Sequence, residues 1–451
     1  MPPPQNSFTS SATCIHSKGT LIDLGEALCH SQTNVSVALL AGYTYLGQFI
    51  DHDITHTFGS DTLASGDVSP HTYVNIAKAN LALTSVYASD QLQQQPGINS
   101  QSGEFQLSAV IDDNERIVTA MQADLPRDPH SKQALIPDER NDENLLVAQI
   151  HLHFLKLHNH FVRQQASALS PQDAFLNAKQ QVIQAYQSIV VHDYLRTILQ
   201  YDVWHWYFAQ TREPLVAEQR LAQNLFYQQG VPREFSGAAF RFGHSMVREK
   251  YRLNATTEAT LAELFQYTGR ARLNGRSHLP LSHVVELSGF FEPGALHEQK
   301  ANDIRPHIGI ILPHFEWPAN CLAVRNLFRA QTLGLPSAQF VLEYVQRNLP
   351  EALGNELDWL SAAEINHPLL DSLGHKTALQ QSTPLLFYVL LEAYKKGRSR
   401  TLGPLASIII AETFFNLLGR DKNGQINLPN ADFNMRKLIA ITKSMKGASH
   451  E

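Results

Sequence analysis

The sequence predicts a mainly α-helical fold with very little β structure. Apolar side chains recur at helical spacing in long stretches of the chain. A serine followed by proline and, two residues later, aspartate (Ser170 to Asp173) has the pattern of a helix start. Convincing alternation of apolar and polar residues, the pattern of a half-buried strand, is rare. We expect helices over residues 36–55, 142–165, 170–190, 241–251, 321–333, 337–347, 385–394 and 404–418.

The length and composition predict one large folded unit. The chain has 451 residues, of which 43% are hydrophobic and 17% charged, so it can bury a large core. Residues 1–30 are rich in Ser, Thr and Pro and lack periodicity, which predicts an arm on the surface or on a neighbouring subunit. We expect a single domain over residues 31–451, with long loops between residues 89 and 137.

Charge and cysteine content exclude several classes of function. The formal net charge is -6 and there is no long basic run, so no nucleic-acid partner is expected. Three cysteines cannot form a disulfide framework. No signal peptide is visible at the start, so we expect a cytoplasmic protein, with export by a non-classical route left open. The apolar run 402–418 is too short to span a membrane, so no membrane span is expected.

The segment GQFIDHD (residues 47–53) concentrates polar side chains on a helix whose other face is apolar. Gln48, Asp51 and His52 are spaced i, i+3 and i+4, so they share one face. Taken alone, a histidine beside a carboxylate is more often a structural pair than a catalytic one. The segment therefore predicts a polar helix face but does not decide its use.

Three further segments have the same ambiguity. In DERNDEN (residues 138–144), Arg140 and Glu143 can point the same way, although acidic residues also simply favour a helix start. In FRFGH (residues 240–244), a glycine beside His244 lets a bulky group approach the backbone. In RNLFR (residues 325–329), an amide and an arginine lie three apart. A buried histidine bonded to an asparagine is a common structural device.

Taken in order, the four segments resemble the animal-type haem peroxidases, the peroxidase–cyclooxygenase superfamily. Further stretches resemble its shorter bacterial members, so the resemblance spans about residues 37–420. It implies a multi-helix fold around a buried haem, with residues 31–451 as one haem peroxidase domain. These further stretches are LPRDP (125–129), LHNHF (157–161), LGLPS (333–337), TPLLFYVLLEA and LGPLASIIIAE.

The resemblance implies a peroxidase that reduces hydrogen peroxide and oxidises a small electron donor through a ferryl intermediate. His52 matches the residue that moves a proton between the two peroxide oxygens, and Arg140 the residue that stabilises the charge developing as the O–O bond breaks. Gln48 matches a residue near which halides sit, so bromide, iodide or thiocyanate are candidate donors, as are phenols. His244 matches the proximal ligand of the haem iron.

Three more residues match the surroundings of a b-type haem. Asn326 would accept a hydrogen bond from the second ring nitrogen of the proximal histidine and fix its orientation. A neutral amide in that place leaves the ring less electron-rich than a carboxylate would, which favours a more oxidising iron. Arg241 and Arg329 would pair with the haem propionates.

The resemblance also implies covalent attachment of the haem. Asp51 and Glu143 match the two acids that form ester bonds to haem methyl groups, a reaction that depends on exposure to peroxide. Asn144 occupies the place of a methionine that forms a third, sulfonium link in myeloperoxidase. That third link is therefore not expected.

The resemblance supports a calcium site only in part. Asp53 matches a calcium ligand of the family, but its partner loop, residues 78–87, has Ala82 where an aspartate belongs and Thr84 in place of a serine. Ca²⁺ prefers several anionic oxygens. We therefore hypothesise that the ammonium group of Lys78 replaces the ion and neutralises Asp53.

Alternatives from other classes remain. Fatty-acid dioxygenases of the superfamily carry a radical tyrosine three residues before the proximal histidine, where this chain has Arg241, so a peroxidase is favoured. A haem scaffold without turnover is disfavoured by the pairing of His52 with Arg140. A divalent-metal hydrolase is a third alternative, although the histidines of one helix are better explained by a partly buried helix with a solvated polar side. These are His151, His153, His158 and His160. The oligomeric state stays open.

Overall fold

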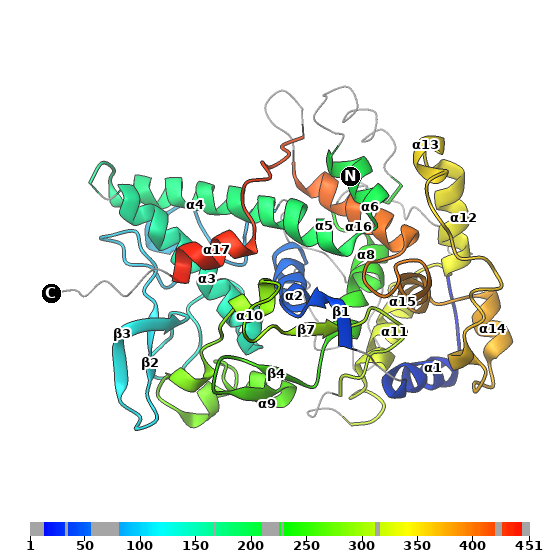
Figure 1. Ribbon diagram of the computed structural model, residues 1–451, viewed down its shortest axis with the longest axis horizontal. Coiled ribbons are helices and arrows are strands. Elements are labelled where there is room, and N and C mark those ends of the chain that lie inside the picture. The colour runs from blue at the N-terminus through cyan, green and yellow to red at the C-terminus, as the bar shows by residue number, and fades with distance from the viewer. Residues whose placement is uncertain are drawn as a thin grey trace.

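Helices make up most of the computed structural model of the chain, as the sequence predicts (Figure 1). The structure describes residues 13–31, 35–55, 81–165, 167–209, 225–226, 230–311, 316–419 and 426–443. The α-helices of this part are α1 (Lys18–His30), α2 (Gly42–Ile54), α3 (Leu145–Gln165), α4 (Pro171–Ser188), α5 (Leu195–Ile198), α6 (Tyr201–Trp204), α8 (Arg233–Gly237), α9 (Leu261–Gln266), α10 (Ser288–Phe291), α11 (Leu322–Thr332), α12 (Ala338–Asn348), α13 (Glu351–Gly354), α14 (Lys376–Gln381), α15 (Leu385–Lys395), α16 (Pro404–Leu417) and α17 (Met435–Lys443).

Shorter helical turns and small sheets connect these helices. The 3₁₀ turns are η4 (Leu92–Gln94), η5 (Glu139–Asp142), η8 (Ala239–Met246), η9 (Arg272–Gly275), η10 (Leu281–His283) and η11 (Pro368–Leu370), and the π turns are η6 (Ile189–Tyr194) and η7 (His205–Ala209). The strands are β1 (Val35–Leu40), β2 (Ser108–Ile111), β3 (Ile117–Asp124), β4 (Lys250–Arg252), β5 (Glu258–Thr260), β6 (Leu279–Pro280) and β7 (Lys300–Asn302). The pairs β1–β7 and β4–β5 are antiparallel, and β2 lies between antiparallel β3 and parallel β6.

Strongly periodic segments of the sequence are helices, as predicted. Helices α11, α12, α15 and α16 begin and end within about one residue of the expected bounds. The predicted cap of α4 is also present, because the hydroxyl of Ser170 accepts a hydrogen bond from the amide of Asp173 at 3.2 Å.

Three expectations about the first part of the chain need correction. The helix predicted over residues 36–55 is strand β1 followed by α2, because β1 pairs with β7 and the amide of Ala41 donates to Gln299. Within the arm predicted over residues 1–30, residues 1–12 lie outside the described residues, and α1 packs against α11 with buried leucines. The loops expected between residues 89 and 137 contain the β2–β3 hairpin, whose second strand is largely exposed and so lacks a clear apolar alternation.

Helix α2 lies at the centre of the fold (Figure 1). It packs against α3, α10, η6 and η8, and α15 and α16 pack against the other side of η8. Gly47 permits the contact with η6, because a β-carbon there would collide with the hydroxyl of Tyr194. Within α2, Tyr43, Gln48 and Asp51 keep partial exposure while the other side chains are buried. In the second half of α2, Gln48 and Asp51 of the predicted polar face are therefore the side chains that keep some exposure.

A buried ion group fixes turn η5, which leads into α3. The guanidinium of Arg127 donates to both carboxylate oxygens of Asp124 at 2.5 and 2.9 Å and to both of Asp142 at 2.7 and 3.0 Å. The amide of Gly269 also donates to Asp142, at 2.8 Å. All three charged side chains are at most 5% exposed. Because every partner is satisfied, this group holds the backbone of η5 in one position.

Replacing Arg127 with methionine is expected to lower the free energy of unfolding by about 3–5 kcal/mol, since two carboxylates would remain buried without their cation. Chemical denaturation followed by circular dichroism measures the loss. Arg163→Met is the matched control, because the Arg163–Glu104 pair at 2.6 Å is partly exposed and should contribute at most about 1 kcal/mol. Equal effects of the two substitutions would contradict the role given to Arg127.

Candidate active site

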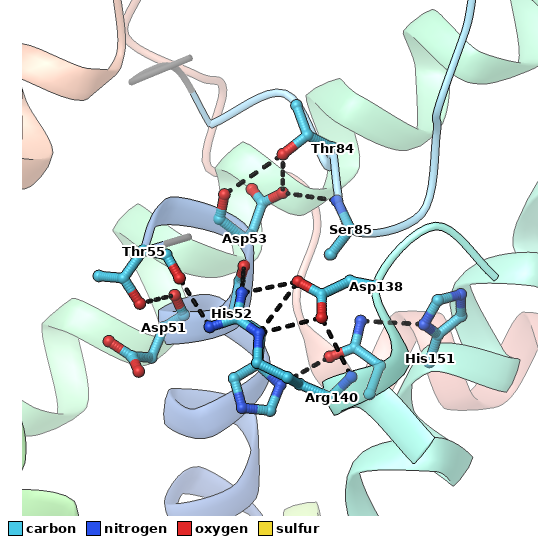
Figure 2. A network of polar contacts seen from close by, with 10 residues as sticks. Asp51, His52, Asp53, Thr55, Thr84, Ser85, Asp138, Arg140 and His151 are labelled. Atoms are coloured by element: carbon cyan, nitrogen blue, oxygen red, sulfur yellow. Dashed lines mark hydrogen bonds and ion pairs between the residues drawn. The ribbon is translucent and has the colours of Figure 1, made fainter. Parts of the chain in front are cut away.

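His52 lies in the last turn of α2 with its imidazole ring buried. Its Nδ1 lies 2.9 Å from the side-chain oxygen of Asn141, the third residue of η5 (Figure 2). An amide oxygen can only accept, so Nδ1 carries the proton and donates it. In the neutral ring the lone pair is then on Nε2. His52 is thus held in the tautomer that can act as a base through Nε2.

The surroundings of His52 favour its neutral form. Burial lowers the pKa of His52 below the ordinary histidine value, and the positive charge of Arg140 lowers it further. The carboxylates of Asp51 and Asp138 oppose this shift without reversing it. A neutral imidazole with a free lone pair is therefore available at neutral pH.

Arg140 clamps the end of α2. Its Nη2 donates to the carbonyl of His52 and its Nη1 to the carbonyl of Thr55, both at 2.7 Å, where the helix dipole favours a cation. Nε and Nη2 also bind the carboxylate of Asp138, with the shortest contact at 2.6 Å (Figure 2). Four of the five N–H groups are used in this way. Arg140 places a positive charge beside His52 and keeps one Nη1 hydrogen for another acceptor.

Asp51 shares the polar face of α2 with Gln48, and both side chains are partly exposed. Figure 2 shows the carboxylate of Asp51 pointing away from Asp138 and Arg140. Its charge acts to raise the pKa of His52 and also that of His244. Helix α2, which carries His52, packs against η8, which carries His244. The distal and proximal histidines predicted from the sequence therefore lie on elements that contact each other.

His244 lies in η8, and its ring contacts Asn326 of α11. The Asn326 Nδ2 is 2.8 Å from His244 Nδ1, so the amide donates to the ring. The sequence-based expectation has the opposite direction, with the ring donating to the amide oxygen. Rotating the amide by half a turn interchanges the two arrangements. Burial and the charge of Arg241 lower the pKa of His244 to about 3, while the ring remains partly exposed.

Most of the other residues that the sequence predicts to contact haem interact with other residues of the protein. Arg241 donates through Nε to the carbonyl of Ser236 at 2.9 Å. Arg329 lies one turn after Asn326 on α11 and is partly buried. Glu143, which the sequence assigns to an ester link, forms an ion pair with exposed Arg270 at 2.6 Å. Asp51, the other assigned acid, has no hydrogen bond from its carboxylate to any residue that the structure describes.

These residues fit a large cofactor bound through an imidazole. A β-carbon built on Gly243 would meet no atom within 4 Å, so there is open space beside the backbone next to His244. The side chains of Gln48, Asp51 and Arg241 are partly exposed, and α2 and η8, the elements that carry them, pack against each other. An imidazole ligand held by a buried amide, with acids and arginines around it, is the set of donors that a haem requires.

Within the described part of the chain, Asp53 is surrounded by hydrogen-bond donors and not by further anionic oxygens. Its carboxylate is buried and accepts hydrogen bonds from the amides of Leu83 and Ser85, both at 3.2 Å, and from the hydroxyl of Thr84 at 3.3 Å (Figure 2). Burial raises its pKa to about 6. Hydrogen-bond donors therefore occupy oxygens that a cation would need. Lys78, which we expect to neutralise Asp53, lies outside the described residues.

The sequence did not assign a role to Asn141 or Asp138, although both lie in the DERNDEN segment. Their position on either side of Arg140 is the only signal that marks them. The histidines of α3 are also more buried than expected, since His151, His153 and His158 are all enclosed. Each binds a different partner, Asn141, Thr442 or Tyr87, so these three do not converge on one ion.

A separate cavity of about 790 Å³ lies between α3, α10, α17 and the β2–β3 hairpin. Its lining includes His153 and Lys156 and none of the residues assigned above to the active site. None of the helices that the structure describes combines the length and apolar character needed to cross a bilayer.

Comparison with known structures shows the fold. Peroxidase A from Dictyostelium discoideum is 17% identical with a TM-score of 0.58, and the match covers 95% of this chain and 87% of that one. The fatty acid alpha-dioxygenase of Arabidopsis thaliana is 13% identical with a TM-score of 0.59, covering 97% and 75%. That of Oryza sativa is 14% identical with a TM-score of 0.57, covering 95% and 76%. No curated protein matches the sequence.

The sequence profile of the animal haem peroxidases matches residues 60–297. This match covers more than half of the chain and includes both the DERNDEN and the FRFGH segments. The solved structures above have the same overall fold over nearly the whole chain. The chain therefore belongs to the animal haem peroxidase family.

Proposed function

We propose that the chain is a haem peroxidase that reduces hydrogen peroxide and oxidises a small electron donor, a halide, thiocyanate or a phenol. The observation that carries the proposal is the state of His52, a buried neutral imidazole with a free Nε2 beside the positive charge of Arg140. Haem, when bound, would supply an iron that takes up peroxide and would hold the two oxidising equivalents of peroxide until the donor is oxidised. Other steps are assigned to side chains of this chain.

His52 moves the proton. Its Nε2 takes the proton from the oxygen of peroxide that meets the cofactor and returns it to the far oxygen, which leaves as water. A base positioned in this way is typically worth about 10²–10⁴-fold in rate. Because the Nδ1 hydrogen is already bound to Asn141, the ring needs no rearrangement before it accepts the proton.

Arg140 contributes mainly charge and position. Most of its N–H groups bind Asp138 and the end of α2, so the side chain is held rigidly next to His52. Its positive charge stabilises negative charge that develops on the leaving oxygen, and the remaining Nη1 hydrogen can donate to that oxygen. The clamp also fixes the last turn of α2, on which His52 depends.

The proximal side holds the cofactor. His244 would bind the iron through Nε2, with Asn326 on the other ring nitrogen. Iron binding requires a bare Nε2, so the proton of the neutral ring moves to Nδ1 and the Asn326 amide presents its oxygen. Arg241 and Arg329 are the cations that would pair with the propionates.

A fatty-acid dioxygenase is the second candidate, because two of the matching structures have that activity in their names. In the family, that reaction depends on a tyrosine three residues before the proximal histidine, a position occupied here by Arg241. We therefore favour the peroxidase. Oxygen uptake with a long-chain fatty acid, in the absence of peroxide-driven donor oxidation, would instead support the dioxygenase.

The pH dependence of the reaction with peroxide tests the role of His52. In the haem-loaded protein, the second-order rate constant should stay level near neutral pH and fall only below about pH 6.5, because the pKa of His52 lies under the ordinary value. Arg140→Met removes the charge that lowers this pKa, so the fall should begin at higher pH. His52→Ala should lower the rate constant about 10²-fold or more. Stopped-flow absorption spectroscopy measures all three.

The matched control for Arg140→Met is Arg116→Met, which removes an exposed arginine paired with Asp112 on the β2–β3 hairpin. It should leave both the rate and its pH profile unchanged. A reaction of His52→Ala at the normal rate, with haem bound, would contradict the proposed function.

The two acids should differ in covalent attachment of haem. The carboxylate of Asp51 accepts no hydrogen bond from the described part of the chain, whereas that of Glu143 is bound to Arg270. After treatment with peroxide and denaturation, Asp51→Asn should release most of the haem and Glu143→Gln a smaller part. Mass spectrometry of the polypeptide with and without haem measures the attached fraction. Haem that stays attached to the Asp51→Asn, Glu143→Gln double variant would refute both assignments.

A further inference from the structure

We propose that His151 is a positioning residue for the peroxide reaction, which acts through Asn141 to hold His52 in the tautomer with a bare Nε2. The inference rests on the proposed function. The family resemblance assigns roles to residues that would touch the cofactor. His151 is not one of them: it lies in the first half of α3 and is joined to His52 through Asn141.

The three side chains form a continuous buried chain of hydrogen bonds. His52 Nδ1 is 2.9 Å from Asn141 Oδ1, and Asn141 Nδ2 is 3.0 Å from His151 Nδ1. Asn141 and His151 have no exposed surface, and His52 is 8% exposed. Figure 2 shows His52 and His151 on opposite sides of this network. The amide of Asn141 therefore links the two imidazole rings.

An amide has an accepting end and a donating end, so its two contacts are not independent. If Nδ2 donates to His151, Oδ1 must face His52, and His52 must then carry its proton on Nδ1. If the amide turned around, its NH₂ group would face His52, and the ring would carry its proton on Nε2. In that tautomer His52 could not take a proton from peroxide through Nε2. While His151 Nδ1 is an acceptor, it therefore holds Asn141 in the orientation that selects the catalytic tautomer.

His151 is suited to remain an acceptor. Burial lowers its pKa to about 3, and the carboxylate of Asp138 opposes this only in part. The ring stays neutral near physiological pH, with its proton on Nε2. Phe49 of α2 packs edge-on against it, with ring centroids 5.9 Å apart.

The unpartnered donor of His151 distinguishes it from a structural histidine. Its Nε2 is buried without a hydrogen-bond partner among the described residues. By contrast, His158 on the same helix uses both ring nitrogens, with Tyr87 and Gly103 each at 3.0 Å. Burying an unsatisfied donor lowers stability. Among the described residues, the ring of His151 has a hydrogen bond with the amide of Asn141, and this contact orients the amide.

The test compares His151→Phe with the control His153→Phe in the haem-loaded protein. Both substitutions remove one buried histidine of α3 that binds through Nδ1, but His153 contacts Thr442 and not Asn141. His151→Phe should bind haem normally and react with peroxide on the order of 10-fold to 100-fold more slowly, within the range that acid–base catalysis supplies. His153→Phe should react at the wild-type rate.

A second substitution that restores the rate distinguishes control of the His52 tautomer from an effect on packing. Asn141→Asp has no donating end, so in the His151→Phe background both of its orientations accept from His52 Nδ1. The double variant should regain at least ten-fold of the lost rate, on the order of what positioned acid–base catalysis supplies. The fall in rate at low pH should move to higher pH, because a carboxylate raises the pKa of His52. A purely structural effect of His151→Phe would not be reversed at residue 141.

The outcomes are distinct. A slow His151→Phe that Asn141→Asp does not rescue, or a His151→Phe that reacts at the wild-type rate, overturns the inference and leaves the proposed function intact. A normal rate in His52→Ala overturns the proposed function itself. If His151→Phe does not fold, ¹⁵N NMR of histidine in the wild-type ferrous carbon monoxide form decides. Protonated Nδ1 on His52 supports the inference, and protonated Nε2 on His52 refutes it.

Discussion

The hydrogen bond from His52 Nδ1 to the oxygen of Asn141 is the interaction on which the proposed active site depends. A histidine on a buried helix can act as a base only if its free nitrogen faces the substrate, and this bond decides which nitrogen is free. The bond in turn requires η5 to lie against the end of α2. Arg140 joins the two elements from one side by binding Asp138 and the last carbonyls of α2.

A buried ion group, separate from the contacts of Arg140, also holds η5 in place. Arg127 links Asp142 of η5 to Asp124 at the end of β3, and Gly269 contributes an amide. Stability and function are therefore connected through one short turn. The same 3₁₀ turn carries Arg140 and Asn141, while its last residue anchors it in the core. The proposed acid–base group is thus held by a buried hydrogen bond to Asn141 and by partly buried contacts of Arg140, while the ion group behind η5 is buried.

The sequence predicts the long apolar helices well, because burial on all sides leaves an unmistakable pattern in segments such as α15 and α16. It also predicts that His52 and His244 belong to one site, and α2 and η8, the elements that carry them, pack against each other. Strand β1 was not predictable, because its pairing partner β7 lies far along the chain. Helix α1 was not predicted either, although Leu21, Leu24 and Leu28 recur at helical spacing, and these leucines are buried where α1 packs against α11.

Partners of single polar groups were the least predictable part of the site. The spacing within the DERNDEN segment places Arg140 and Glu143 on one side of a turn. It does not show that Arg140 binds the end of α2 or that Glu143 binds Arg270. Asn141 was read only as part of a motif, because its two imidazole partners come from different helices. Such contacts are set by tertiary packing and not by spacing along the chain.

Resonance Raman spectroscopy of the ferrous haem-loaded protein tests most directly whether His244 binds the iron while His52 lies on the opposite face of the haem. An iron–histidine stretching band should be present in the wild type and in His52→Ala, and it should disappear in His244→Gly. Retention of the band in His244→Gly, or its loss in His52→Ala, would contradict the assignment of the two faces.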